Sequence, residues 1–200
     1  MQQTVTEQQE LSDKHFLMLT QESGISEEVI RMRGYWTCDD EDDLMDMGFN
    51  KRQRRVPCLV IPVRGISGEV AFDRIRPDSP RPAPKKPGKV IKYEQPSGTP
   101  VVLDVPSPPE GLQDVSRRLW IVEGEKKSDA LVSCGEVAIA LLGVWNWKKD
   151  GWMLPDWDHI PLMGRDVIIA FDSDAVHNHQ VRLAEDALAS ALEVRGGFVG

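Results

Sequence analysis

The chain has 200 residues, a mass of 22.5 kDa and a formal net charge of −8, with 40% hydrophobic and 28% charged residues. It is long enough to enclose a hydrophobic core, and no apolar run approaches the roughly 20 residues of a membrane span, which excludes peptide scaffolds and membrane-spanning proteins. Cys38, Cys58 and Cys134 lie far apart without a CxxC pair, which argues against a disulfide framework or a zinc site. The first residues carry no secretion signal pattern, so a cytoplasmic location is expected.

The charge is distributed unevenly along the chain. Residues 51–92 contain 12 of the 24 lysines and arginines and only three acidic side chains, whereas the segments on either side are acidic. Such an asymmetry is typical of a face that binds a polyanion, although a solvated charged loop would explain it equally well.

The first half of the chain reads as short helices followed by strands. We expect a disordered lead over 1–10, then short helices within 11–24 and 23–34, the second capped by Ser26 and stopped by Gly34, and another within 41–49.

A hairpin of strands over 56–65 and 68–77 is predicted next. In its second strand we expect Val70, Phe72 and Ile75 to face a core, with a bulge near Arg74.

Proline-rich residues 78–89 predict a mobile basic loop, residues 90–94 a further strand, and residues 106–114 a boundary loop.

The second half has the pattern of an open α/β unit. Continuous apolar runs at 119–122, 137–142 and 166–171 predict buried strands of a parallel sheet, and residues 125–135 and 181–197 predict helices. The tryptophans at 145, 147, 152 and 157 favour packing of a long connection over stacking on bases.

Acidic side chains follow two of these strands directly. Glu123 ends the first, and Asp172 and Asp174 follow the third. If the two strands are neighbours, the three carboxylates meet at one edge of the sheet, where they would hold Mg²⁺ or Mn²⁺. The alternative is that these carboxylates cap the helices that follow.

Two segments together resemble the TOPRIM domain of primases, topoisomerases and related nucleases. They are IVEGEKKSDAL (121–131) and IIAFDSDA (168–175). Their sequences are most similar to those of the primases and primase-helicases of phages, plasmids and integrative elements, including a family described as a domain of unknown function. The resemblance implies a Rossmann-like parallel sheet over 115–200, with its C-terminal end expected to be missing, preceded by a small α+β basic subdomain over 11–114.

The segment GKVIKYEQPSGTP (88–100) resembles the Lys-Tyr segment near the template groove of replicative primases. This resemblance implies that the basic region faces nucleic acid. The candidate phosphate contacts are Arg52, Arg54, Arg55, Arg74, Arg76 and Lys92. We further expect Lys126 and Lys127, in the first turns of a helix, to bind nucleotide phosphates.

The resemblance implies a DNA primase core that makes RNA primers on single-stranded DNA from NTPs during mobile-element replication. Glu123, Asp172 and Asp174 would be the catalytic, metal-holding residues, with a replicative helicase as a possible partner and no membrane contact. Lys127 stands where many primase TOPRIM domains carry an acid, which leaves open whether Glu125 or Asp129 assists. A TOPRIM nuclease and a non-catalytic DNA-binding remnant stay as alternatives.

Overall fold

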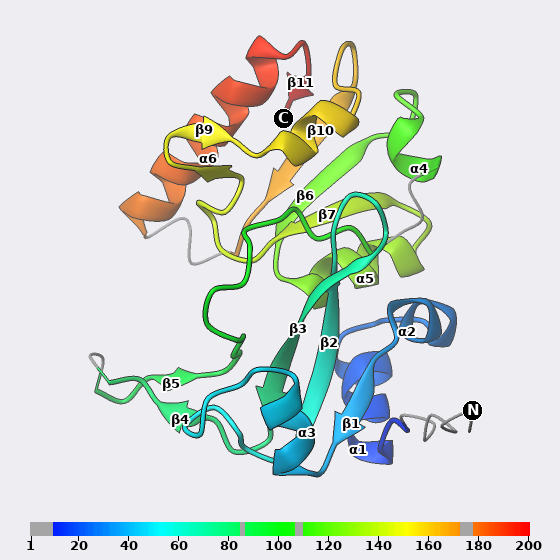
Figure 1. Cartoon of the computed structure of the whole chain (residues 1–200). Coiled ribbons are helices and arrows are strands. Elements are labelled where there is room, and N and C mark those ends of the chain that lie inside the picture. The colour runs from blue at the N-terminus through cyan, green and yellow to red at the C-terminus, as the bar shows by residue number, and fades with distance from the viewer. Residues whose placement is uncertain (1–9, 85–86, 107–109, 173–177) are drawn as a thin grey trace, which may run out of the picture.

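The computed structural model describes residues 10–84, 87–106, 110–172 and 178–200. The protein has two halves: short helices and an antiparallel sheet near the N-terminus, and a parallel sheet with its helices near the C-terminus (Figure 1). This confirms the mixed α/β class, with a four-stranded parallel sheet that follows an α+β region along the chain. The expected lead lies outside the described residues except for Glu10.

Short helices form the N-terminal head. They are α1 Asp13–Leu17, the π-helix η1 Met18–Glu22, α2 Glu27–Arg33 and α3 Glu41–Asp46. Ser26 caps α2 by accepting a hydrogen bond from the Val29 N–H at 3.3 Å, and Gly34 ends α2 with φ 83°, as the sequence predicts.

The antiparallel sheet has the order β1-β2-β3 and contains the predicted hairpin. Its strands are β1 Trp36–Cys38, β2 Cys58–Arg64 and β3 Val70–Pro77. The three residues of β1 are too few to show a strand pattern, and the sequence did not predict them.

The predicted position of the bulge in β3 is wrong. The register shifts between Val63 and Arg64, at the turn end of the hairpin, and pairing is regular around Arg74. Val70 is accordingly 45% exposed while Ile75 is fully buried. Because side chains alternate along a strand, Phe72 lies on the face of Arg74 and not on that of Ile75, so the predicted inward set is corrected to Ile75 alone.

A small hairpin follows, made of β4 Arg81–Pro82 and β5 Val90–Ile91. The predicted basic loop therefore includes an edge strand, where proline is tolerated, and the strand expected over 90–94 is shorter. Glu94 pairs back onto Ile75 through two backbone hydrogen bonds of 2.9 Å. This pairing ties the segment with Lys92 and Tyr93 to β3.

The parallel sheet has the order β11-β10-β6-β7. Ile169 of β10 lies opposite Ile121 of β6, so the two strands that precede the candidate carboxylates are neighbours, as expected. The strands are β6 Leu119–Glu123, β7 Val137–Leu141, β10 Asp166–Ala170 and β11 Phe198–Val199.

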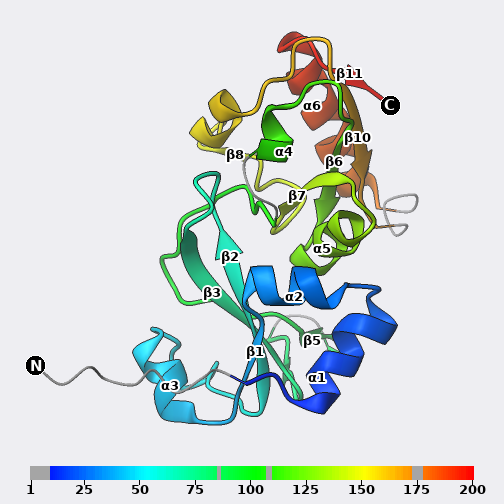
Figure 2. The same ribbon diagram turned by 90° about the vertical axis from the view of Figure 1, so that its right-hand side faces the viewer.

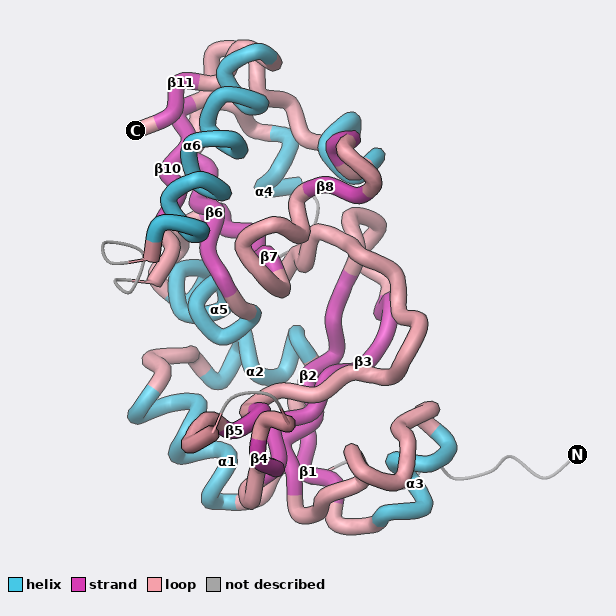
Figure 3. The backbone as a smooth tube through the Cα atoms, turned by 90° about the vertical axis from the view of Figure 1, so that its left-hand side faces the viewer, coloured by secondary structure: helices cyan, strands magenta, loops and turns pink. Residues whose placement is uncertain are grey.

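The predicted helices are α5 Glu125–Ser133 and α6 His179–Val194, and α6 runs beside β10 (Figure 3). Short elements not predicted are α4 Glu110–Gln113, β8 Lys148–Lys149, β9 Trp152–Met153 and the 3₁₀ helix η2 Pro155–His159.

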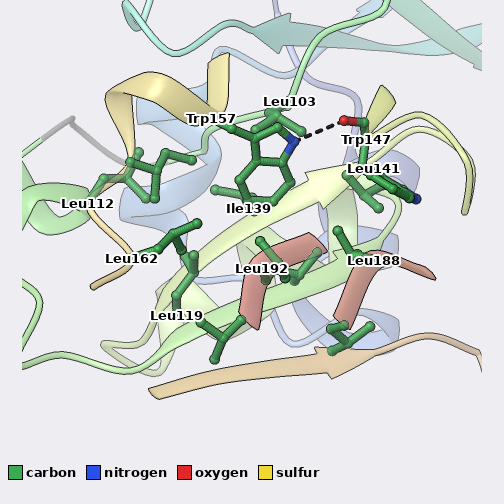
Figure 4. Packing of buried hydrophobic residues seen from close by; sticks show 14 of the residues in the cluster. Leu103, Leu112, Leu119, Ile139, Leu141, Trp147, Trp157, Leu162, Leu188 and Leu192 are labelled. Carbon is green, nitrogen blue, oxygen red and sulfur yellow. Dashed lines mark hydrogen bonds between the residues drawn. The ribbon is translucent and has the colours of Figure 1, made fainter. Parts of the chain in front are cut away.

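One apolar cluster holds the parallel-sheet half together (Figure 4). Trp157 is fully buried in it and donates its indole N–H to the Trp147 carbonyl at 2.9 Å. The packing interpretation is confirmed for these two tryptophans, whereas Trp152 is 80% exposed.

A buried charge cluster joins the halves where α2 lies against α5 (Figure 2). The Arg33 guanidinium donates to Asp104 at 2.5 and 2.9 Å and to Asp129 at 2.7 Å, and the Tyr35 hydroxyl also donates to Asp129. Burial alone would lower the pKa of Arg33, but the two carboxylates outweigh it and raise that pKa. The cluster therefore links α2, the connection between the halves and α5.

Candidate nucleotide and nucleic-acid cleft

A cleft of about 560 Å³ lies between the two halves. From the parallel-sheet half it is lined by Glu123, Lys126, Lys127 and Asp172, among others. From the N-terminal half it is lined by Arg74 and Arg76 of β3 and by Lys92. The structure thus brings seven of the candidate residues to one place.

The two described carboxylates come from the carboxyl ends of neighbouring strands. Glu123 is the last residue of β6, and Asp172 follows β10 after one intervening residue. The capping alternative is wrong for both, because Gly124 caps α5 and the Asn178 side chain caps α6 by accepting from the Gln180 N–H at 3.1 Å. Asp174 lies outside the described residues.

Lys127 sits against these carboxylates. Its ammonium forms an ion pair with Asp172. Burial lowers the pKa of Lys127, and the charge of Glu123 partly offsets that effect. In the described part of the chain, no three potential metal-ligating side chains gather. The ammonium group of Lys127 therefore lies at the same edge of the sheet as Glu123 and Asp172.

Lys126 connects α5 to the N-terminal head. Its ammonium donates to the Ser23 hydroxyl at 3.0 Å. Burial and the nearby Arg76 lower its pKa, while Glu22 and Glu125 act in the opposite direction. The positive charges of the cleft therefore repel one another at Lys126, and a bound anion would relieve this repulsion.

Arg74 crosses from β3 to the start of α5. It donates to Glu125 at 2.6 Å, and its guanidinium lies 5.1 Å from the centre of the Tyr93 ring. Arg76 shares its face of β3 because the two residues are two positions apart. The face of β3 that looks away from the core therefore forms the basic wall of the cleft.

Three candidate arginines lie elsewhere. Arg54 donates to the Phe49 carbonyl at 2.8 Å and Arg55 to the Ser79 carbonyl at 2.6 Å, while Arg52 is exposed in a turn. None of the three lines the cleft.

Sequence reasoning missed the contribution of the head. Glu22 and Ser23 line the cleft, although about a hundred residues separate them from Lys126 and no motif marks them. The two acids left open by the sequence are both engaged, Glu125 by Arg74 and the fully buried Asp129 by Arg33.

This fold is similar to that of solved DNA primase catalytic cores. The Aquifex aeolicus primase with its zinc-binding and RNA polymerase domains aligns with a TM-score of 0.60 at 15% identity, covering 94% of this chain and 49% of that one. The DnaG catalytic core aligns with 0.56 at 21% identity, covering 95% and 61%. The DnaG primase catalytic domain bound to ssDNA aligns with 0.51 at 20% identity, covering 86% and 56%. The chain spans about half to three fifths of the length of these structures.

Residues 112–199 match the family described as "Domain of unknown function (DUF3854)". This segment includes β6, α5, β7, β10 and α6, and therefore the carboxylate side of the cleft. No curated protein matches the chain. In the described residues, no helix combines the length and apolar character needed to cross a bilayer.

Proposed function

We propose that this chain is a TOPRIM-type primase core that transfers nucleotidyl groups from NTPs to a growing RNA strand on a single-stranded DNA template. The observation that carries the proposal is the cleft, in which Glu123 and Asp172 face Arg74, Arg76 and Lys92. Phosphoryl chemistry needs this combination, since acidic groups hold a divalent cation and basic groups hold phosphates. The fold similarity to primase cores supports it.

The two halves contribute different parts of the proposed core. We assign residues 115–200 to the TOPRIM domain and residues 11–114 to the basic subdomain that holds the template. Lys126 and Lys127 would contact the triphosphate, because both line the cleft near the start of α5. A role in mobile-element replication and a replicative helicase as partner belong to the same proposal.

The donor set suits Mg²⁺ or Mn²⁺. Glu123 and Asp172 supply oxygen ligands only, and Mg²⁺ commonly binds through one or two carboxylates together with substrate phosphates. We propose Asp174 as a further ligand by its place in the sequence. When bound, the ion would neutralise charge on the triphosphate and align the attacking and leaving oxygens.

Primer synthesis on single-stranded DNA tests the proposal directly. The protein is incubated with the DNA, labelled NTPs and Mg²⁺, and short labelled RNA is the expected product. Cleavage of the DNA without RNA would instead identify a TOPRIM nuclease. Salt-sensitive DNA binding without either reaction would identify the non-catalytic alternative. The ion pair between Lys127 and Asp172 is the observation that favours this alternative.

Replacing Lys127 by methionine should strengthen Mn²⁺ binding by about tenfold, because the variant removes a cation that competes for Asp172. Titration followed by electron paramagnetic resonance measures the affinity without any need for activity. Lys149→Met, an exposed lysine outside the cleft, is the matched control and should leave the affinity unchanged. Equal Mn²⁺ affinity in Lys127→Met and the wild type would contradict this prediction.

Arg76→Gln should weaken binding of single-stranded DNA and reduce the slope of log affinity against log salt by about 0.7, the value expected for one lost phosphate contact. Fluorescence anisotropy at several salt concentrations gives both quantities. Arg182→Gln on α6 controls for net charge, and Arg52→Gln tests whether the DNA contacts extend beyond the cleft. An unchanged slope in Arg76→Gln would remove β3 from the proposed DNA-binding face.

A further inference from the structure

Glu125 is a buried carboxylate in a cleft lined by several cations. Its side chain is 2% exposed, and it accepts a hydrogen bond from Arg74 at 2.6 Å. Burial of a carboxylate is unfavourable unless it is paired, and here the pairing with Arg74 is reinforced by the position of Glu125 as the first residue of α5, where a helix favours negative charge. The buried ion pair between Glu125 and Arg74 is therefore a stable structural element of the cleft wall.

Arg74 is fixed on two sides and retains an unused donor. Glu125 holds one of its terminal nitrogens, and the Tyr93 ring lies 5.1 Å from the centre of its guanidinium. Its Nε is buried and has no hydrogen-bond partner in the described part of the chain. Because the guanidinium is a rigid plane of donors, fixing one nitrogen fixes the direction of the others. Because that Nε is closed to solvent, a ligand in the cleft would reach the guanidinium through its terminal nitrogens, whose direction the pairing with Glu125 fixes.

We propose that Glu125 is a positioning residue, which acts through Arg74 to direct that guanidinium at the triphosphate of a bound nucleotide. This inference rests on the proposed function, which places NTPs in the cleft. Arg76 and Lys126 line the same cleft, so a polyphosphate with several negative charges is the class of ligand that fits.

Whether removal of Glu125 strengthens or weakens phosphate binding distinguishes a positioning role from a purely electrostatic one. Removing Glu125 takes one negative charge out of an anion-binding cleft, and on charge alone this would strengthen the binding of phosphates. If Glu125 instead holds Arg74 in place, its removal weakens that binding, because the freed guanidinium must lose conformational entropy when the ligand binds.

Calorimetric titration with inorganic tripolyphosphate, in the absence of divalent cations, measures this effect on the full chain. We expect Glu125→Ala to bind about tenfold more weakly than the wild type, and Glu125→Gln to bind within about twofold of it, because the amide oxygen still accepts from Arg74. Arg74→Ala should be equally weak or weaker, and adding Glu125→Ala to it should cause no further loss. Melting temperatures show whether each variant folds.

Glu125→Asp provides a second route if Glu125→Ala does not fold. It keeps the charge but is one methylene too short to reach Arg74 in the same geometry, so we expect weaker binding than in Glu125→Gln. Binding by Glu125→Ala at or above the wild-type affinity, additive losses in the double variant, or no tripolyphosphate binding by the wild type would each overturn the inference. A wild type that binds tripolyphosphate but makes no primers would contradict the proposed primase function alone, and the double-variant comparison would still decide the role of Glu125.

Discussion

Asp172→Asn and Glu123→Gln are each expected to reduce Mg²⁺-dependent primer synthesis by at least about a hundredfold, because several kcal/mol of transition-state stabilisation would depend on a bound divalent cation. Both side chains line the cleft and neither caps a helix, so the substitutions remove charge without removing a structural hydrogen bond to a helix end. Extension of a labelled primer on single-stranded DNA measures the rate, and thermal unfolding measures stability. We expect the melting temperatures to stay within about 2 °C of the wild type, because Asp172 is exposed, Glu123 is half-buried, and each amide has nearly the volume of the carboxylate it replaces.

Asp166→Asn is the matched control for Asp172→Asn. Asp166 is the first residue of β10, at the end of the strand away from the cleft, and its carboxylate is 66% exposed. The control makes the same chemical change on the same strand and should leave synthesis unaffected. Full activity in Asp172→Asn, or an equal loss in Asp166→Asn, would contradict the assignment of the carboxylates.

Arg33→Met is expected to lower the free energy of unfolding by about 3–5 kcal/mol, the usual cost of removing one partner from a buried ion pair. The substitution leaves the fully buried carboxylates of Asp104 and Asp129 without their counter-charge. Burial already raises the pKa of Asp129 in the wild type, and the charge of Arg33 opposes that shift. Loss of Arg33 should therefore raise the pKa of Asp129 further, and the destabilisation should be largest at neutral and higher pH, where the Asp129 carboxylate would be ionised.

Urea unfolding at pH 5 and pH 8 checks both the size and the pH dependence of this effect. Arg31→Met is the matched control, because Arg31 is exposed on the same helix and forms no ion pair within the described residues. It should change stability by less than about 0.5 kcal/mol, as surface substitutions usually do. Similar unfolding curves for the two variants would show that the cluster contributes little to the docking of α2 on α5.

The sequence alone was enough to locate the parallel sheet and the two carboxylates that line the cleft. Apolar runs and glycine stops are local signals, and the rule that ligands bind beyond the carboxyl ends of parallel strands converts them into a position for Glu123 and Asp172. The helix caps at Ser26 and Gly34 were predictable for the same reason, since a cap depends on residues within one turn.

Long-range packing determined the rest. No sequence pattern pairs Arg33 with Asp104 and Asp129, or brings Ser23 to Lys126, because these contacts form only when α2 docks against α5. Tertiary structure also separated the basic residues, placing Arg74 in the cleft and directing Arg55 to the Ser79 carbonyl. Charge patterning along the chain thus revealed a basic region, while the pairing of β3 with its neighbours determined which of its cations face the carboxylates.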